Sequence, residues 1–289
     1  MDVSGKTKVC AIIGDPVEHS LSPTMHNAAF NVLGLNLVYV AFTVNANDLE
    51  SAVLGAKTLG IRGLNVTMPH KNAVIKYLDK LDGSATGIGA VNTVLNENGK
   101  LVGYNTDGVG ALAALQENGV FVEEKKLVIL GAGGSAQAIA YAASQETDEL
   151  VILNRTVANA QRLAEGLRKN VDSTIKADVL SAAVLKKELA DADILINATS
   201  VGMHPNTDKS PVPAEYLRPD LSVMDIIYNP LQTKLALDAK VAGAKVVSGL
   251  EMLVYQGAVS FEIWTNCPAP VQAMKTAALT KLREHGVQV

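Results

Sequence analysis

Features that mark secreted and membrane proteins are scarce in this sequence. It has two cysteines, no N-terminal segment with the layout of a signal peptide, and no uncharged apolar run that approaches roughly 20 residues. We therefore expect a cytoplasmic protein that makes no contact with a membrane. Cys10 lies in an apolar, strand-like run, which predicts a buried free thiol rather than a disulfide.

An excess of positive charge and the spacing of a metal site are also missing. The chain carries 25 Lys and Arg residues against 29 Asp and Glu, a net charge of −4, whereas nucleic-acid binding leaves a basic footprint. No spacing of His, Cys, Asp and Glu residues is typical of a metal site. The sequence therefore predicts neither a nucleic-acid partner nor a metal site.

The composition is that of a compact, folded protein. Of the 289 residues, 48% are apolar and 19% are charged, which suits a sizeable core, and the length suggests two domains. Predicted strands alternate with predicted helices at the start of the chain, which is typical of an α/β domain with a mostly parallel sheet. Here we expect strands at 8–14, 37–44 and 61–67, and helices at 23–33 (with Ser22 as its cap), 48–59 and 71–81.

A turn and further α/β units follow. Asn98-Gly99 is a strong hairpin signal between two strand-like runs. A helix from about Gly108 to Glu117 is expected to lead into a second domain. Later strands are expected at 126–130, 150–153, near 174, and at 193–198, 221–228 and 245–247, with helices at 136–143, 158–167, 182–189, 233–242, 252–261 and 271–284.

A glycine-rich loop opens the second half of the chain. Gly131, Gly133 and Ala136 match a dinucleotide-binding fingerprint, placed between a predicted strand and a predicted helix. The glycines permit a tight turn and close approach of the backbone to a pyrophosphate, and a helix N-terminus favours phosphate. The next strand ends at Asn154-Arg155-Thr156, where an NAD enzyme tends to carry an acid. An arginine there favours the 2′-phosphate of NADP.

The stretch from Gly63 to Lys71 and the segments before and after it carry several polar side chains. A nicotinamide cofactor implies hydride transfer, so the protein must also handle a proton. Lys71 and Asp107 are the ionisable pair that we predict for this task. Alternatives for the same task are His19, His26 and His70. Neutral groups that suit a substrate dense in hydroxyls are Ser20, Ser22, Asn65, Thr67 and Asn92.

Nine short segments carry a resemblance that covers nearly the whole chain. They are 14–23 (GDPVEHSLSP), 65–71 (NVTMPHK), 89–93 (GAVNT), 103–108 (GYNTDG), 131–136 (GAGGSA), 154–156 (NRT), 197–202 (NATSVG), 228–230 (YNP) and 249–256 (GLEMLVYQ). In sequence and in order, these segments resemble the signatures of the shikimate dehydrogenase family. Together they are far more specific than the glycine loop alone.

The resemblance implies a reaction and an architecture. The reaction is the reversible, NADPH-dependent reduction of 3-dehydroshikimate to shikimate, on the way to chorismate and the aromatic amino acids. The architecture has an N-terminal α/β catalytic domain with a mostly parallel sheet (1–106), a Rossmann-like NADP-binding domain (107–248), and C-terminal helices (249–289) that return to the catalytic domain. Substrate would lie in the cleft between the domains, and the protein would be a monomer or homodimer.

The same resemblance implies roles for individual residues. Lys71 would be the proton donor and acceptor, with Asp107 beside it. Ser20 and Ser22 would hold the substrate carboxylate, which Tyr228 would approach from the Rossmann side. The residues implied to bind substrate hydroxyls are Asn65, Thr67, Asn92, Asp107 and Gln256. The residues implied to bind NADP are Gly131, Ala132, Gly133, Gly134, Ser135, Ala136, Asn154, Arg155, Thr156, Thr199, Ser200, Ile226 and Gly249, the last near the nicotinamide.

Two positions depart from the family pattern. Family members often carry a second basic residue shortly after Asn-Arg-Thr, and Asn159 stands there in this chain. Position 136 is alanine, which the motif tolerates. Ser22 favours shikimate over quinate.

Two alternative functions are kept. One is a quinate/shikimate dehydrogenase with relaxed cofactor use. The other is an inactive NADP-binding regulator, against which the presence of Lys71 and Asp107 argues.

Overall fold

The computed structural model describes residues 3–169 and 171–284, which form two compact units. Unit 1 contains residues 3–106 and 256–284, and unit 2 contains the described residues of 107–255. The first boundary falls just before helix α4 (Asp107–Glu117), and the second falls within helix α9 (Gly249–Thr265). No helix in the described part of the chain has both the length and the apolar character that a membrane span requires.

Unit 1 is built on a mixed six-stranded sheet with the order β2-β1-β3-β5-β6-β4. β1 pairs in parallel with β2 and β3, β5 is antiparallel to both β3 and β6, and β4 is parallel to β6. Asn98 and Gly99 both adopt positive φ, 53° and 87°, so the predicted hairpin turn between β5 and β6 is confirmed. The strands are β1 (Lys8–Gly14), β2 (Leu37–Thr43), β3 (Gly63–Val66), β4 (Lys80–Leu81), β5 (Thr93–Glu97) and β6 (Lys100–Tyr104).

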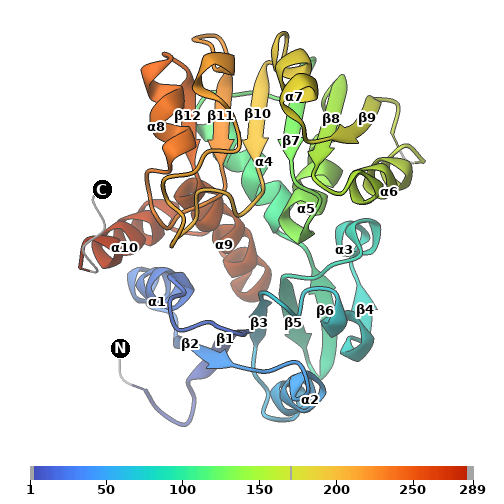
Figure 1. Ribbon diagram of the computed structural model, residues 1–289. Helices are drawn as coiled ribbons and strands as arrows, with labels where there is room; N and C mark the ends of the chain where they lie inside the picture. The colour runs from blue at the N-terminus through green and yellow to red at the C-terminus, as the bar shows by residue number, and fades with distance from the viewer. Residues whose placement is uncertain (1–2, 170, 285–289) are drawn as a thin grey trace. The chain divides into compact units, whose positions relative to one another are not determined.

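Helices cover both faces of this sheet because side chains alternate along each strand. Ala11 and Ile13 of β1 face an apolar core that includes Val53 of α2. An aromatic cluster of Phe30, Tyr39, Phe261 and Trp264 also lies in this unit, where α1 packs against α10 (Figure 1). The helices are α1 (Ser22–Val32), α2 (Leu49–Thr58), η1 (Ala73–Tyr77), α3 (Gly83–Ile88), the second part of α9, and α10 (Val271–Glu284).

The structure corrects two expectations in unit 1. Residues 71–81 form a turn, the short 3₁₀ helix η1 and strand β4 instead of one helix. Tertiary contacts favour this path, because Asp79 accepts a hydrogen bond from the Leu101 amide at 2.7 Å and forms an ion pair with Lys57 at 2.8 Å. Ser22 is the first residue of α1 and not its cap, since Leu21 occupies the cap position and no side chain bonds the helix end.

Unit 2 contains a six-stranded sheet in which every neighbouring pair is parallel. The order β12-β11-β10-β7-β8-β9 can be followed across the upper part of Figure 1. This is the doubly wound order. Successive strands are added outward from β7 on one side and from β10 on the other, and such sheets bind ligands at the point between them. The strands are β7 (Lys126–Leu130), β8 (Glu149–Asn154), β9 (Thr174–Val179), β10 (Ile194–Asn197), β11 (Ser222–Asp225) and β12 (Lys245–Ser248).

The strands of unit 2 are buried on both faces, which explains their continuous apolar sequences. In β7, Leu127 and Ile129 pack into one core, whereas Val128 and Leu130 pack into the other. Helices α4, α5, α6 and the start of α9 contribute to the first core, and α7 and α8 to the second. The helices not yet given are α5 (Gly134–Ala143), α6 (Val157–Leu167), α7 (Ala182–Leu189), η2 (Ala214–Tyr216) and α8 (Lys234–Val241).

Candidate active site

The predicted substrate residues of unit 1 gather at one edge of its sheet. β1, β3 and β6 run in the same direction and β5 runs against them, so the carboxyl ends of three strands meet the amino end of the fourth. Ser20 and Ser22 follow β1, Thr67 and Lys71 follow β3, and Asn92 precedes β5. The strand directions therefore bring together side chains that are spread over more than seventy positions of sequence.

Backbone contacts hold two of these loops together. The Thr67 amide donates to the Ile13 carbonyl at 2.9 Å, and the Asp15 amide donates to the Met68 carbonyl at 3.0 Å. Gly14 lies at the contact, where an added Cβ would come within 2.3 Å of the Thr67 Cγ2 atom. Glycine at position 14 therefore leaves the space that the Thr67 side chain occupies.

Asn65 is almost fully buried beneath this edge, with 5% of its surface exposed. Its Oδ1 accepts a 2.6 Å hydrogen bond from the Tyr39 hydroxyl. Its Nδ2 has three acceptors between 3.1 and 3.2 Å, which are the Asn92 carbonyl, Thr93 Oγ1 and Ser260 Oγ. Burial raises the pKa of Tyr39 well above its ordinary value, so this hydroxyl keeps its proton.

Asn92 is buried at the same edge and joins three segments of unit 1. Its Oδ1 accepts from the Thr106 amide at 2.8 Å and from the Thr93 hydroxyl at 3.0 Å. Its Nδ2 donates to Thr106 Oγ1 at 2.9 Å and to Gln256 Oε1 at 3.4 Å. The structure thus brings the predicted residues Asn65, Asn92 and Gln256 into one hydrogen-bonded network.

The two predicted ionisable residues belong to different units. Lys71 is half-buried in unit 1, and its carbonyl accepts from the Val91 amide at 2.8 Å, which ties its backbone to the segment entering β5. Asp107 is buried as the first residue of α4 in unit 2. Their pairing stays a prediction, as does the approach of Tyr228, a half-buried residue of unit 2, to the substrate.

The histidine alternatives have distinct environments. Nε2 of buried His70 lies 2.6 Å from the Val44 carbonyl, which gives this ring a structural hydrogen bond. His26 is fully buried, neither ring nitrogen has a partner, and burial lowers its pKa to about 3. A base with that pKa is poorly matched to proton transfer near neutral pH. His19 is exposed on the loop after β1.

In unit 2, the glycine loop lies at the switch between β7 and β10. Gly131 follows β7 with φ of 112°, and an added Cβ would come within 2.8 Å of the Ala198 carbonyl oxygen, just after β10. Helix α5 begins at Gly134, so its N-terminal amides follow directly. The tight turn at Gly131 and the N-terminal end of α5 both fit the pyrophosphate of a dinucleotide.

The ends of the neighbouring strands supply the other predicted cofactor residues. Asn154 ends β8, and its Nδ2 donates to the Thr156 carbonyl at 2.9 Å, which shapes the turn that presents Arg155 to solvent. Asn159 is also exposed, on the first turns of α6. Ala132, Gly133, Ser135 and Ala136 lie in the loop after β7 and at the start of α5.

A buried carboxylate organises the loops after β10 and β11. Asp225 accepts from Asn197 Nδ2 at 3.0 Å, the Thr233 hydroxyl at 2.6 Å and the Ile227 amide at 3.2 Å. Asn197 in turn accepts from the Thr199 hydroxyl at 2.7 Å. Burial raises the pKa of Asp225 to about 6, although these hydrogen bonds oppose the change. The predicted segments Thr199-Ser200 and Ile226–Tyr228 are thus tied to the sheet.

Gly249 packs closely against one of these loops. An added Cβ at Gly249 would come within 2.3 Å of the Ile226 carbonyl oxygen. The Ile226 amide donates to the Asn197 carbonyl at 3.1 Å, so the loop has little room to yield. Glycine at 249 therefore lets helix α9 begin against the end of β11.

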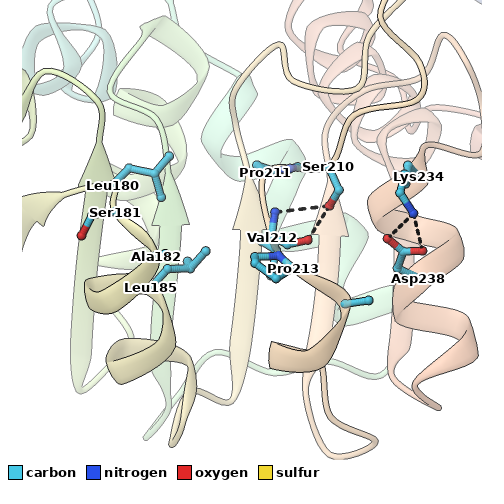
Figure 2. Close-up of a pocket in the computed structure, with 11 residues that line it drawn as sticks. Leu180, Ser181, Ala182, Leu185, Ser210, Pro211, Val212, Pro213, Lys234 and Asp238 are labelled. Carbon is cyan, nitrogen blue, oxygen red and sulfur yellow. Dashed lines mark hydrogen bonds and ion pairs between the residues drawn. The ribbon is translucent and has the colours of Figure 1, made fainter.

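Unit 2 contains a separate cavity of about 440 Å³. Figure 2 shows the residues that line it, between α7 and α8. Leu180, Leu185 and Val212 form its apolar wall, and Lys234 and Asp238 form an ion pair at one side with a 2.9 Å separation. None of the predicted catalytic, substrate or cofactor residues lines it. This cavity is therefore distinct from the glycine-loop site.

Comparisons with known proteins match almost the whole chain. Residues 12–94 match the shikimate dehydrogenase substrate binding domain, 113–225 match shikimate / quinate 5-dehydrogenase, and 249–279 match the shikimate 5′-dehydrogenase C-terminal domain. The shikimate dehydrogenase (NADP(+)) of Methanopyrus kandleri is 53% identical over 286 residues, covering 98% of this chain and 99% of the relative.

The chain belongs to the shikimate dehydrogenase family. Two solved structures of the family are similar along nearly their full length. A shikimate dehydrogenase in complex with NADP+ has a TM-score of 0.91 at 48% identity, covering 97% of each chain. Shikimate 5-dehydrogenase from Listeria monocytogenes, in complex with shikimate and NAD, has a TM-score of 0.91 at 42% identity, covering 96% of this chain and 98% of that one.

Several residues that shape these sites were not among the predicted ones. Thr93, Ser260 and Tyr39 support the family's polar residues in unit 1, and Asn197 and Asp225 support the loops of unit 2. Thr93 and Asn197 lie inside family segments, so the signal for them was present. Nothing in the sequence singles out Ser260. Its side-chain partners are 154 to 195 positions away, and its one near partner is the Gln256 carbonyl, one helical turn earlier.

Proposed function

We propose that this chain catalyses the reversible, NADPH-dependent reduction of 3-dehydroshikimate to shikimate, a step of chorismate and aromatic amino acid biosynthesis. The observation that carries the proposal is the near full-length likeness to a shikimate dehydrogenase (NADP(+)) at 53% identity. The gathered polar residues of unit 1 and the glycine loop of unit 2 supply groups that this reaction needs.

NADPH, when bound, supplies a hydride to the carbonyl carbon of the substrate. Lys71 donates a proton to the carbonyl oxygen as the alcohol forms, and takes it back in the reverse direction. Asp107 is proposed to act with Lys71 and to accept a hydrogen bond from a substrate hydroxyl. Water re-protonates Lys71 between turnovers, so hydride and proton together balance the reduction.

Neutral groups bind the rest of the substrate in this proposal. Ser20 and Ser22 donate to its carboxylate, with Tyr228 as a further contact. The proposed hydroxyl-binding residues are Asn65, Thr67, Asn92 and Gln256. Because protein groups already occupy the amide of Asn65, a substrate hydroxyl there donates to the remaining lone pair of Oδ1.

The proposed cofactor residues are those of the glycine loop and the strand ends. Backbone amides at Gly131–Ala136 would bind the pyrophosphate, and Thr199, Ser200, Ile226 and Gly249 would line the path toward the nicotinamide. Arg155 would bind the 2′-phosphate, within the turn made by Asn154 and Thr156. Relaxed use of NAD is the second candidate, because Asn159 offers no second charge and a Listeria relative is complexed with NAD.

Location and assembly complete the proposal. We infer a cytoplasmic protein, supported by the buried Cys10 and the half-buried Cys267, which are both free thiols. A monomer or homodimer is proposed, and light scattering of the purified protein distinguishes the two.

The decisive experiment is the oxidation of shikimate by the purified protein, followed at the absorbance of NADPH. NADP+ and NAD+ are compared side by side, with quinate as a second substrate. Fast turnover with shikimate and NADP+ alone supports the proposal. Comparable rates with NAD+ or quinate support a quinate/shikimate dehydrogenase with relaxed cofactor use. Absence of turnover with every combination of substrate and cofactor contradicts both candidate functions.

A further inference from the structure

The side chain of Ser260 lies at the centre of the polar network in unit 1. It is completely buried on α9, one turn after Gln256. Its Oγ lies 2.8 Å from Thr93 Oγ1 and 3.2 Å from both Thr106 Oγ1 and Asn65 Nδ2. It also donates toward the Gln256 carbonyl at 3.0 Å. One hydroxyl thus joins helix α9 to β3, β5 and the end of β6.

The available hydrogens give this network a direction. Asn65 Nδ2 can only donate, so Ser260 accepts from it. Asn92 Nδ2 likewise donates to Thr106 Oγ1, whose own hydrogen has two acceptors at 3.2 Å, Asn92 Oδ1 and Ser260 Oγ. The Thr93 hydroxyl has two acceptors, Asn92 Oδ1 at 3.0 Å and Ser260 Oγ at 2.8 Å, when the Ser260 hydrogen is donated to the Gln256 carbonyl. Both amides are therefore oriented by hydroxyl groups that ultimately meet at Ser260.

We infer that Ser260 is a positioning residue for substrate binding, which orients the amides of Asn65 and Asn92 and anchors the turn of α9 that carries Gln256. This inference rests on the proposed function. A network of neutral, buried groups holds a fixed geometry more firmly than single contacts do, because each unmet group would be costly. The correct amide orientation presents a defined donor or acceptor to each substrate hydroxyl, and a misplaced amide offers the wrong one.

The test compares Ser260→Ala with a matched removal of a buried serine hydroxyl elsewhere. Ser144 is 2% exposed in unit 2, and its Oγ donates to the Tyr141 carbonyl at 2.9 Å. We expect Ser260→Ala to raise the KM for shikimate about tenfold while the KM for NADP+ stays within about twofold. Ser144→Ala should leave the KM for shikimate unchanged, even where it lowers the melting temperature by a similar amount.

A double-mutant cycle with Thr93→Val distinguishes an effect through the shared hydroxyl contact from a general loss of stability. If Ser260 and Thr93 act through their shared contact, the double variant should raise the KM for shikimate no more than the larger single change. Thr93→Ser keeps the hydroxyl and should raise the KM less than Thr93→Val. If Ser260→Ala does not fold, the comparison of Thr93→Val with Thr93→Ser alone tests whether this hydroxyl contact supports shikimate binding.

The failures are distinguishable. Absence of shikimate turnover by the wild-type protein would overturn the proposed function, and this inference with it. Normal wild-type turnover, together with an unchanged KM for shikimate in Ser260→Ala and Thr93→Val, would overturn the inference alone. Equal rises in the KM for shikimate and for NADP+ would also overturn it, because they would indicate a general structural defect.

Discussion

The two units build their functional edges from different kinds of buried groups. In unit 1, the side chains beneath the edge are amides and hydroxyls, centred on Asn65, Asn92 and Ser260. In unit 2, a carboxylate, Asp225, holds the loops after β10 and β11. A neutral network keeps its hydrogen bonds at any ordinary pH, whereas a buried carboxylate changes its charge as pH crosses its pKa. The comparison predicts substrate-binding geometry that is insensitive to pH and cofactor loops that respond to it.

The same contrast extends to one buried titratable group in each unit. His26 in unit 1 stacks on Tyr39 with 4.5 Å between ring centroids, and burial lowers its pKa to about 3. Asp225 has three hydrogen-bond donors, yet burial still raises its pKa to about 6. Each group is shifted toward its neutral form, because desolvation acts unopposed at His26 and outweighs the three hydrogen bonds at Asp225. Because one is a base and the other an acid, they give stability opposite dependences on pH.

The largest effect should come from removing Lys71, the proposed proton donor of unit 1. Lys71→Ala should lower kcat by about 10³-fold, the usual scale for general acid–base catalysis, with a modest change in KM. Steady-state kinetics of shikimate oxidation measure both constants. Lys76→Ala is the control, because Lys76 is exposed on η1. Near-normal turnover by Lys71→Ala would remove this lysine from the mechanism.

Neutralising the carboxylate of unit 2 should change how stability depends on pH. The pKa of Asp225 is raised from 3.8 to about 6, so its stabilising contribution is present below about pH 3.8 and is lost as pH rises through 6. Between pH 4 and 7, Asp225→Asn should therefore gain about 2 kcal/mol relative to the wild type. Hydrogen exchange of the β10 and β11 amides measures this in unit 2.

The control for that experiment is Asp208→Asn, since Asp208 is exposed in the same unit. Its difference from the wild type should be the same at pH 4 and pH 7. If the stability difference between Asp225→Asn and the wild type were also the same at pH 4 and pH 7, the buried carboxylate would not titrate in this range. The proposed difference in pH dependence between the two units would then be wrong.

Cofactor selectivity tests the functional edge of unit 2 directly. Arg155→Ala should raise the KM for NADP+ about tenfold and leave the KM for NAD+ unchanged, because only NADP+ carries the 2′-phosphate. Rates with both cofactors measure the ratio. Arg162→Ala, on an exposed position of α6, is the control. An equal loss in that control would contradict the assignment to Arg155.

The smallest expected effect concerns the buried base of unit 1. The pKa of His26 is lowered from 6.5 to about 3, so its stabilising contribution is present above pH 6.5 and is lost as pH falls toward 3. Between pH 7 and 5.5 the wild type should lose about 1 kcal/mol that His26→Phe retains. Urea unfolding followed by the fluorescence of Trp264, the single tryptophan and a buried residue of unit 1, measures the difference.

Exposed His204 supplies the control for that series. His204→Gln should lose stability with falling pH just as the wild type does. If His26→Phe showed the same loss, another group in unit 1 would carry the dependence on pH.

Local patterns in the sequence were sufficient where neighbouring residues decide the conformation. Asn98-Gly99 predicted a hairpin because both residues tolerate positive φ, and both adopt it. The glycine loop predicted its own place between β7 and α5. The helix expected at 71–81 was wrong, because pairing of β4 with β6 overrides its helical pattern. Helix α3 was missed, although Asp82 caps it through the Ser84 amide at 2.8 Å.

The sequence by itself determined the family and the reaction class, and it predicted residues for substrate and cofactor, because these signals occur in short segments whose chemistry is local. Only the tertiary structure showed what holds those residues in place. Ser260 meets Asn65 and Thr93 across more than 160 positions of sequence, and Asp225 meets Asn197 across a strand pair. Such contacts depend on strand order, which orients an amide, and on burial, which raises or lowers a pKa. Neither strand order nor burial can be read from neighbouring residues in the chain.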